Sequence, residues 1–107
     1  MFSKLYVNEP YYLEVCVTDS EGKPIEGLTI EYRIVRLPNT LVETGILDQC
    51  QEESYIGYQK LVRFSKEGQY RIYYHLPVGY PDTIEHIVVE KNVFEKFLKR
   101  FSNYYPL

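Results

Sequence analysis

Apolar and polar residues alternate with a period of two along several short segments of this chain. In residues 11–19, for example, Leu13 points to one side of the segment and Glu14 to the other. Residues 28–36 and 70–76 repeat this pattern. Because successive side chains of a β-strand face opposite sides of the sheet, the pattern predicts strands with one buried face. Further strands are predicted at residues 4–8, 41–47, 55–65 and 83–91.

Clusters of turn-forming residues separate these predicted strands. Residues 19–24 and 77–82 are rich in Gly, Pro and Asp, which favour turns, and residues 66–69 are predicted to form a tight hairpin turn. The alternation slips between Leu61 and Val62, which predicts a β-bulge there. Many short strands with frequent turn signals are typical of a β-sandwich or a β-barrel.

The last two predicted strands indicate a hairpin with a definite register. If Leu76 pairs with Thr83, then Ile72 lies opposite Ile87, and apolar side chains face each other across the pair.

Residues 37–54 are the least regular part of the chain, and a loop is predicted after residue 47. This loop belongs to an acidic cluster that lacks the residue order of an EF-hand, so a solvated loop is favoured over weak calcium binding or an acidic partner surface.

The apolar positions change to a helical period in the last part of the chain. Phe94, Phe97 and Phe101 recur at helical spacing, which predicts a short amphipathic helix. The chain is therefore divided into a β-sandwich domain, residues 1–91, and a C-terminal amphipathic helix with its tail, residues 92–107.

The three phenylalanines of this predicted helix need a surface that buries them. The helix could cap its own sandwich, or it could pack on a second chain with Lys96, Lys99 and Arg100 facing the acidic body of a neighbour. We favour contact between chains, because a helix joined directly to the last strand has little linker with which to reverse direction. A homodimer is one form of this self-association.

Composition supports a mainly β fold and excludes some classes of function. The chain has 12 tyrosines and no alanine, and alanine is the best helix former. A net charge of −3 argues against a protein that binds nucleic acid through its phosphates. No apolar run is long enough for a transmembrane helix or a signal peptide, so membrane insertion is not expected.

Two segments resemble known immunoglobulin-like domains. The segment from Val17 to Ile30 (VTDSEGKPIEGLTI) resembles a hairpin of bacterial immunoglobulin-like, YtkA-like and carboxypeptidase-regulatory-like domains. The segment from Phe64 to Ile72 (FSKEGQYRI) is similar to the Gly-x-Tyr corner of immunoglobulin-like sandwiches, in which Tyr70 would bond back to the chain. The resemblance implies an immunoglobulin-like β-sandwich of about seven strands. It also implies a spacer, adhesion or partner-binding module outside the cytoplasm or on a surface.

Two pairs of residues could carry chemistry. Cys16 and Cys50 have no Cys-x-x-Cys spacing, so two half-buried thiols are favoured, with a structural disulfide as the alternative. His75 and His86 share one face in the predicted register, with Tyr73 opposite His86. A metal site would need at least one more ligand on that face, so a solvated or packed pair of imidazoles is favoured. No motif for a cofactor is present, and no cofactor or metal is expected.

The tyrosines are the strongest signal for binding, since tyrosine offers a large rigid contact area with a polar tip. Alternation places Tyr32, Tyr58, Tyr70 and Tyr74 inward, and it leaves Tyr55, Tyr73, Tyr80, Tyr104 and Tyr105 at least partly exposed. We therefore expect a non-enzymatic β-sandwich interaction or structural module that binds a protein partner or self-associates. The alternative is a ligand-binding, metal-binding or enzymatic domain that uses the His75/His86 face, and a third is a part of a longer surface protein. The candidate binding residues are Tyr55, Tyr73, His75, His86, Phe94, Phe97 and Phe101.

Overall fold

The computed structural model describes residues 2–52 and 55–91, and this part of the chain forms β-strands joined by loops. The prediction of a mainly β protein is confirmed. The strands are β1 (Phe2–Tyr6), β2 (Pro10–Val15), β3 (Glu31–Arg36), β4 (Thr40–Ile46), β5 (Asp48–Glu52), β6 (Tyr55–Arg63), β7 (Gly68–His75) and β8 (Thr83–Glu90).

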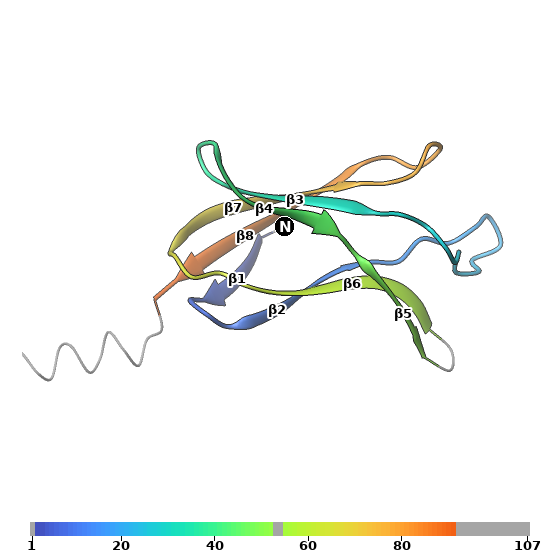
Figure 1. Ribbon diagram of the computed structural model, residues 1–107, viewed down its shortest axis with the longest axis horizontal. Helices are drawn as coiled ribbons and strands as arrows, with labels where there is room; N and C mark the ends of the chain where they lie inside the picture. Colours follow the sequence, from blue (N-terminus) through green and yellow to red (C-terminus); the bar gives the residue numbers. More distant parts are fainter. Residues whose placement is uncertain (1, 53–54, 92–107) are drawn as a thin grey trace, which may run out of the picture.

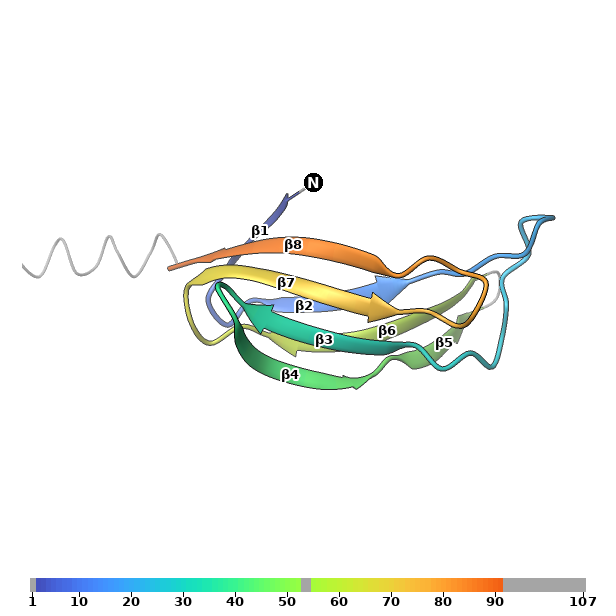
Figure 2. The ribbon, with the colours of Figure 1, turned by 90° about the horizontal axis from the view of Figure 1, so that it is seen from above.

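The strands form two sheets that face each other (Figure 1; Figure 2). One sheet has five strands in the order β1-β8-β7-β3-β4, and the other has three in the order β2-β6-β5. All neighbours are antiparallel except β1 and β8, which run parallel. This distribution of strands between the sheets is that of an immunoglobulin-like β-sandwich, as the sequence resemblance implies.

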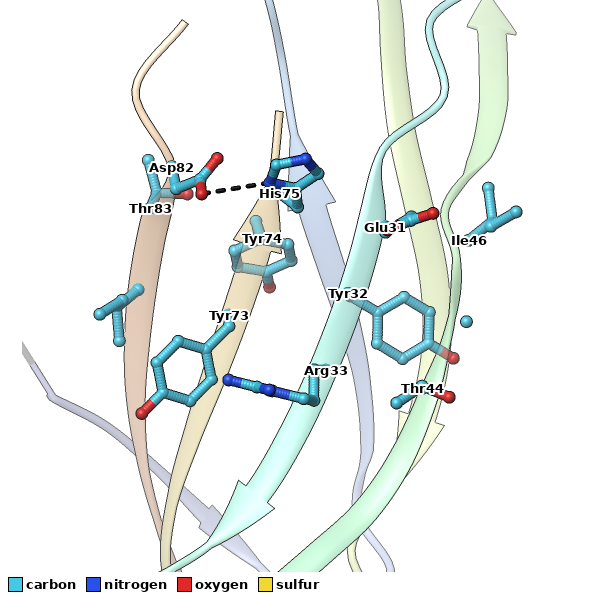
Figure 3. Close-up of a pocket in the computed structure, with 12 residues that line it drawn as sticks. Glu31, Tyr32, Arg33, Thr44, Ile46, Tyr73, Tyr74, His75, Asp82 and Thr83 are labelled. Carbon is cyan, nitrogen blue, oxygen red and sulfur yellow. Dashed lines mark hydrogen bonds and ion pairs between the residues drawn. The ribbon is translucent and has the colours of Figure 1, made fainter. Parts of the chain in front are cut away.

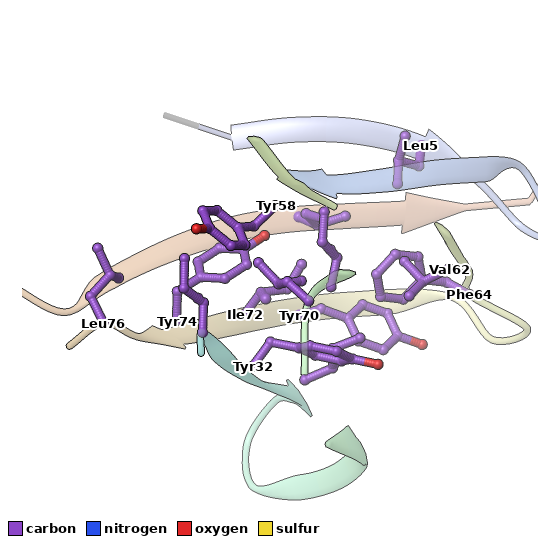
Figure 4. Packing of buried hydrophobic residues seen from close by; sticks show 14 of the residues in the cluster. Leu5, Tyr32, Tyr58, Val62, Phe64, Tyr70, Ile72, Tyr74 and Leu76 are labelled. Carbon is purple, nitrogen blue, oxygen red and sulfur yellow. The ribbon is translucent and has the colours of Figure 1, made fainter. Parts of the chain in front are cut away.

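The core lies between the two sheets, and the predicted alternation decides which side chains enter it. Figure 4 shows buried side chains from both sheets packed together. The inward positions predicted for the best-patterned segments are confirmed, because Leu13, Ile30 and Ile72 are each 0% exposed. The four tyrosines predicted to point inward are also buried, namely Tyr32, Tyr58, Tyr70 and Tyr74.

The strands on either side of the first crossing are shorter than predicted. β2 ends at Val15 and β3 begins only at Glu31, because the chain between them leaves the three-stranded sheet for the five-stranded sheet. The hydroxyl of Tyr58 fastens this crossing segment. It donates a hydrogen bond to the carbonyl of Ile25 at 2.7 Å and accepts one from the Leu28 N–H at 3.0 Å.

The predicted loop after residue 47 is wrong, because residues 48–52 form β5 and pair with β6. The chain leaves β4 at the edge of one sheet and enters the edge of the other.

The predicted bulge at Leu61 and Val62 is also wrong, since the register between β2 and β6 is continuous there. Leu61 is simply an apolar residue on the outer face, 46% exposed. A register shift occurs instead where β3 pairs with β4, between Ile34 and Val35.

Residues 66–69 do not form the predicted hairpin turn, because β6 and β7 belong to different sheets. They form a corner between the sheets, and the Tyr70 hydroxyl donates a hydrogen bond to the Lys66 carbonyl at 2.6 Å. The rings of Tyr70 and Phe64 pack with centroids 4.7 Å apart. The corner role implied for Tyr70 is therefore confirmed.

The predicted register of the last hairpin is wrong by two residues. Tyr74, not Leu76, pairs with Thr83, and Tyr70 lies opposite Ile87. β7 ends at His75, one residue earlier than predicted, and in the loop that follows, the Asp82 side chain accepts a hydrogen bond from the Leu76 N–H at 3.1 Å. A shift of two residues leaves every side chain on its face, so the alternation alone could not distinguish the two registers.

The predicted C-terminal helix lies outside the described residues, as do Phe94, Phe97 and Phe101. The division at residue 91 therefore stays a prediction.

Candidate functional site

The outer face of the five-stranded sheet carries a shallow depression of about 740 Å³. Its floor is a row of side chains across the four strands β8, β7, β3 and β4. The pairing registers place Ile84 beside Tyr73, Tyr73 beside Arg33, and Arg33 beside Thr44. Figure 3 shows Tyr73, Arg33 and Thr44 in this arrangement. We call the residues Ile84, Tyr73, Arg33, Thr44 and Ile46 the outer-face surface.

Arg33 and Tyr73 form the centre of the outer-face surface. The guanidinium carbon of Arg33 lies 4.8 Å from the centroid of the Tyr73 ring, which is the geometry of a cation–π contact. The contact holds these two long side chains against each other. Ile84 and Ile46 flank them with 53% and 54% of their surfaces exposed. The surface therefore combines an aromatic ring, a cation and apolar side chains, which are enriched at protein interfaces.

One end of the depression is bounded by a contact between His75 and Asp82, at the two ends of the β7–β8 loop. The ring nitrogen Nδ1 of His75 lies 3.2 Å from the Asp82 carboxylate (Figure 3). This contact and the Leu76 N–H hold the pKa of the Asp82 carboxyl below its ordinary value. His75 and Asp82 also line a second depression, which Leu28, Pro77 and other residues of the adjoining loops complete.

The other face of these strands holds a partly buried set of two tyrosines and one carboxylate. Glu85 accepts hydrogen bonds from the hydroxyls of Tyr11 and Tyr74, the latter at 2.7 Å. Burial, reinforced by the bond to Glu85, raises the pKa of Tyr11 to about 12, and the same causes raise that of Tyr74. These hydroxyls therefore stay protonated and act as structural donors. Because Tyr11 comes from β2 and Tyr74 from β7, Glu85 ties the two sheets together.

A similar pair lies under the edge strand β4. The Tyr32 hydroxyl donates a hydrogen bond to the Glu43 carboxylate at 2.5 Å. Burial, together with this bond, raises the pKa of Tyr32 to about 12. The ring lies against Gly45, where an added Cβ would come within 2.9 Å of two ring carbons. Glu43 therefore belongs to the structure of the sheet, within the strand that the sequence predicts at residues 41–47.

The predicted pair of His75 and His86 does not form. Both residues belong to the outer face of the sheet, but His86 pairs with Arg71, and Tyr73 pairs with Ile84 instead of His86. The two histidines are separated by four residue positions along the strands, roughly 13 Å. Among residues 2–52 and 55–91, no three His, Cys, Asp or Glu side chains are arranged to hold a metal ion.

The two cysteines are both free thiols. β6 lies between them. Cys50 of β5 pairs with Gly57 of β6, and on the other side the thiol of Cys16, the residue after β2, lies 3.5 Å from the Ile56 carbonyl. Two strand spacings separate their backbones by roughly 9–10 Å, whereas a disulfide needs Cα atoms within about 7 Å. The structure therefore has two thiols and no disulfide between them, but only Cys50 is half-buried as expected, and Cys16 is exposed.

Of the candidate binding residues, Tyr73 and His75 lie together at the depression, and His86 lies apart from it. Tyr55 is the first residue of β6, in the other sheet. Sequence reasoning missed Arg33, Ile46 and Ile84. Their outward position follows from the alternation, but their neighbours follow only from the pairing of distant strands.

Comparisons with known proteins give a fold-level likeness alone. No protein-family model matches the sequence, and no curated protein sequence matches it either. Among solved structures, the chain is similar to one described as chimeric titin Z1Z2 functionalised with a KLER exogenous peptide from decorin. The two share 16% sequence identity with a TM-score of 0.44, over 84% of this chain and 87% of that chain. Within the described ranges, no helix is long and apolar enough to cross a membrane.

Proposed function

We propose that this protein is a non-enzymatic interaction module that binds a protein partner through the outer-face surface. One observation supports this most directly. Arg33 is stacked on Tyr73 in the middle of a depression, with two half-exposed isoleucines beside it. Tyrosine and arginine at the centre of a surface are the residue types that most often dominate the free energy of protein association.

The shape of this surface suits a protein rather than a small molecule. The depression is broad and shallow and lies on an open sheet, whereas small-molecule sites usually enclose most of their ligand. The charges near it are mixed, since Arg33 and Glu31 neighbour the His75–Asp82 pair. We therefore expect a partner that presents an apolar patch with at least one carboxylate to meet the Arg33 guanidinium.

The test compares two tyrosine variants as baits in affinity enrichment from the source cells. Tyr73→Ala removes the centre of the outer-face surface. Tyr12→Ala is the matched control, because Tyr12 is 58% exposed and lies on the other sheet. A partner that uses the proposed surface is retained by the wild type and by Tyr12→Ala, and it is lost from Tyr73→Ala.

A retained partner is then purified and titrated calorimetrically. Removal of a central aromatic residue should weaken the affinity by about tenfold or more. Arg33→Glu should weaken it further, because it reverses the charge that meets the partner. Equal binding by the wild type and both Tyr73 and Arg33 variants would place the binding surface elsewhere.

A further inference from the structure

Among the sheet edges of the described residues, β4 is the longest strand and carries several exposed apolar side chains. Natural proteins protect exposed edges with charges, proline or short strands. Here β1 carries Lys4, β2 begins with Pro10 and β5 begins with Asp48. β4 is seven residues long, and Glu43 is its sole charged residue. The carboxylate of Glu43 is already bound by the Tyr32 hydroxyl of the same sheet.

β4 is also open and apolar on its exposed side. Leu41, Val42 and Ile46 are 59%, 52% and 54% exposed. The strand lies at the rim of the five-stranded sheet, with β3 on one side and no strand of the described residues on the other (Figure 2). An edge strand offers a row of unpaired backbone N–H and C=O groups on its open side, which another strand can meet.

We propose that β4 pairs antiparallel with β4 of a second copy of this chain, about a two-fold axis at Thr44. The argument for a second copy is that this stretch of β4 is complementary to itself. With Thr44 opposite Thr44, Val42 lies opposite Ile46 and Glu43 lies opposite Gly45. Threonine–threonine and apolar cross-strand pairs both stabilise antiparallel strands. A two-fold axis repeats each favourable pair, since both copies present the same surface.

The neighbouring registers are less favourable. If the two-fold axis is perpendicular to the sheet, the outer faces of both copies lie on the same side of the joined sheet. Residues that oppose each other across the junction must then point to the same side of that sheet. The axis must therefore pass through a residue position and not between two residues. An axis at Glu43 would oppose two carboxylates. An axis at Val42 would fall where the pairing of β4 with β3 is irregular. Thr44 lies in the regular part of the strand, where Thr44 and Gly45 pair with Arg33 and Tyr32.

The dimer would join two five-stranded sheets into one continuous sheet. Both copies of the outer-face surface would then lie on the same side of that sheet, with Thr44 of each copy at the junction. This inference does not depend on the proposed function, because strand pairing needs the backbone of β4, whereas partner binding needs the side chains of Tyr73 and Arg33.

The test introduces opposite charges at the proposed axis. Thr44→Lys opposes two ammonium groups across the two-fold axis, and Thr44→Glu opposes two carboxylates, so each variant alone should have the mass of one chain by light scattering. The wild type should approach twice that mass as its concentration rises. Mixing the two variants should restore the larger mass, because lysine now meets glutamate. Thr18→Lys, the same change at an exposed loop residue, should behave as the wild type.

Hydrogen exchange of the wild type supplies a readout that needs no variant. The backbone amides of residues 42–46 should gain protection as the chain concentration rises. The proposal is overturned by a wild type that keeps the mass of one chain at about 1 mM, which is a weak-binding concentration. A dimer that survives Thr44→Lys, or that dissociates with Tyr73→Ala alone, also overturns it. The synthetic peptide TLVETGILD, which has the sequence of residues 40–48, should compete for this edge and lower the mass of the dimer.

Discussion

The large number of tyrosines has a structural explanation at the level of single residues. Tyr32, Tyr58, Tyr70 and Tyr74 bury their rings in the core, and each hydroxyl reaches a carbonyl or a carboxylate at the edge of the sandwich. A buried phenol needs such a partner, because a polar group without one loses its hydrogen bonds to water. These residues therefore act as core residues that also fasten loops and sheets. Of the tyrosines predicted to be exposed, Tyr73 is the one that lies in the outer-face surface.

Tyr70→Phe tests the corner bond in isolation. The variant keeps the ring and loses the hydrogen bond to the Lys66 carbonyl, so the free energy of unfolding should fall by about 1 kcal/mol. Urea unfolding followed by circular dichroism measures the change. Tyr12→Phe removes the same atom from a residue that is 58% exposed, and its stability should equal that of the wild type. An unchanged midpoint for Tyr70→Phe would contradict a stabilising role for the bond.

The faces of single residues were predictable from the sequence, but their partners were not. Leu13, Ile30 and Ile72 were placed in the core by alternation alone. Glu85 lies on the opposite face of β8 from His86, where it bonds to Tyr74. Nothing in the sequence indicated that Glu85 would meet Tyr11, which lies 74 residues away along the chain.

At the level of elements, the sequence analysis missed β5, whereas β4 was predicted at residues 41–47 in the least regular part of the chain. Edge strands are exposed to solvent on most sides, so they show only weakly the alternation of apolar and polar residues that identifies a strand. Six of the seven residues of β4 are exposed, and both ends of β5 carry a carboxylate. Their strand conformation is stabilised by pairing with β3 and β6, which a local pattern cannot reveal.

Gly45 in β4 should resist substitution for a steric reason. A Cβ atom at this position would lie 2.7 Å from the Tyr32 hydroxyl oxygen, closer than real Cβ contacts allow. Tyr32 is buried and bound to Glu43, so its ring cannot move away freely. Gly45→Ala should therefore reduce the free energy of unfolding by about 1–3 kcal/mol, as overpacking of a core does. Thermal or urea unfolding measures this loss.

The control for this prediction removes the ring. In a Tyr32→Leu background, Gly45→Ala should cost much less than in the wild type, because the two positions interact directly. Equal costs in both backgrounds would show that the strain at Gly45 has another origin.

At the level of the whole molecule, the core is closed by residues that precede the C-terminal segment. Every buried apolar side chain of the described residues lies between Leu5 and Val89. A chain that ends at Lys91 should therefore fold, with a melting temperature within about 4 °C of the full chain, which corresponds to less than about 1 kcal/mol. Calorimetry of both chains checks this. A drop of about 10 °C or more would mean that residues 92–107 contribute to the stability of the sandwich.

The sequence alone determined which side chains enter the core, because the period of two is a local property of an extended chain. It also determined the corner at Tyr70, whose hydrogen bond spans four residues. Tertiary structure decided which strands share a sheet, how the last hairpin is registered and which outer side chains meet. A shift of two residues, or a change of sheet, leaves the alternation intact. The contact of Arg33 with Tyr73, and the separation of His75 from His86, therefore follow from long-range pairing of strands.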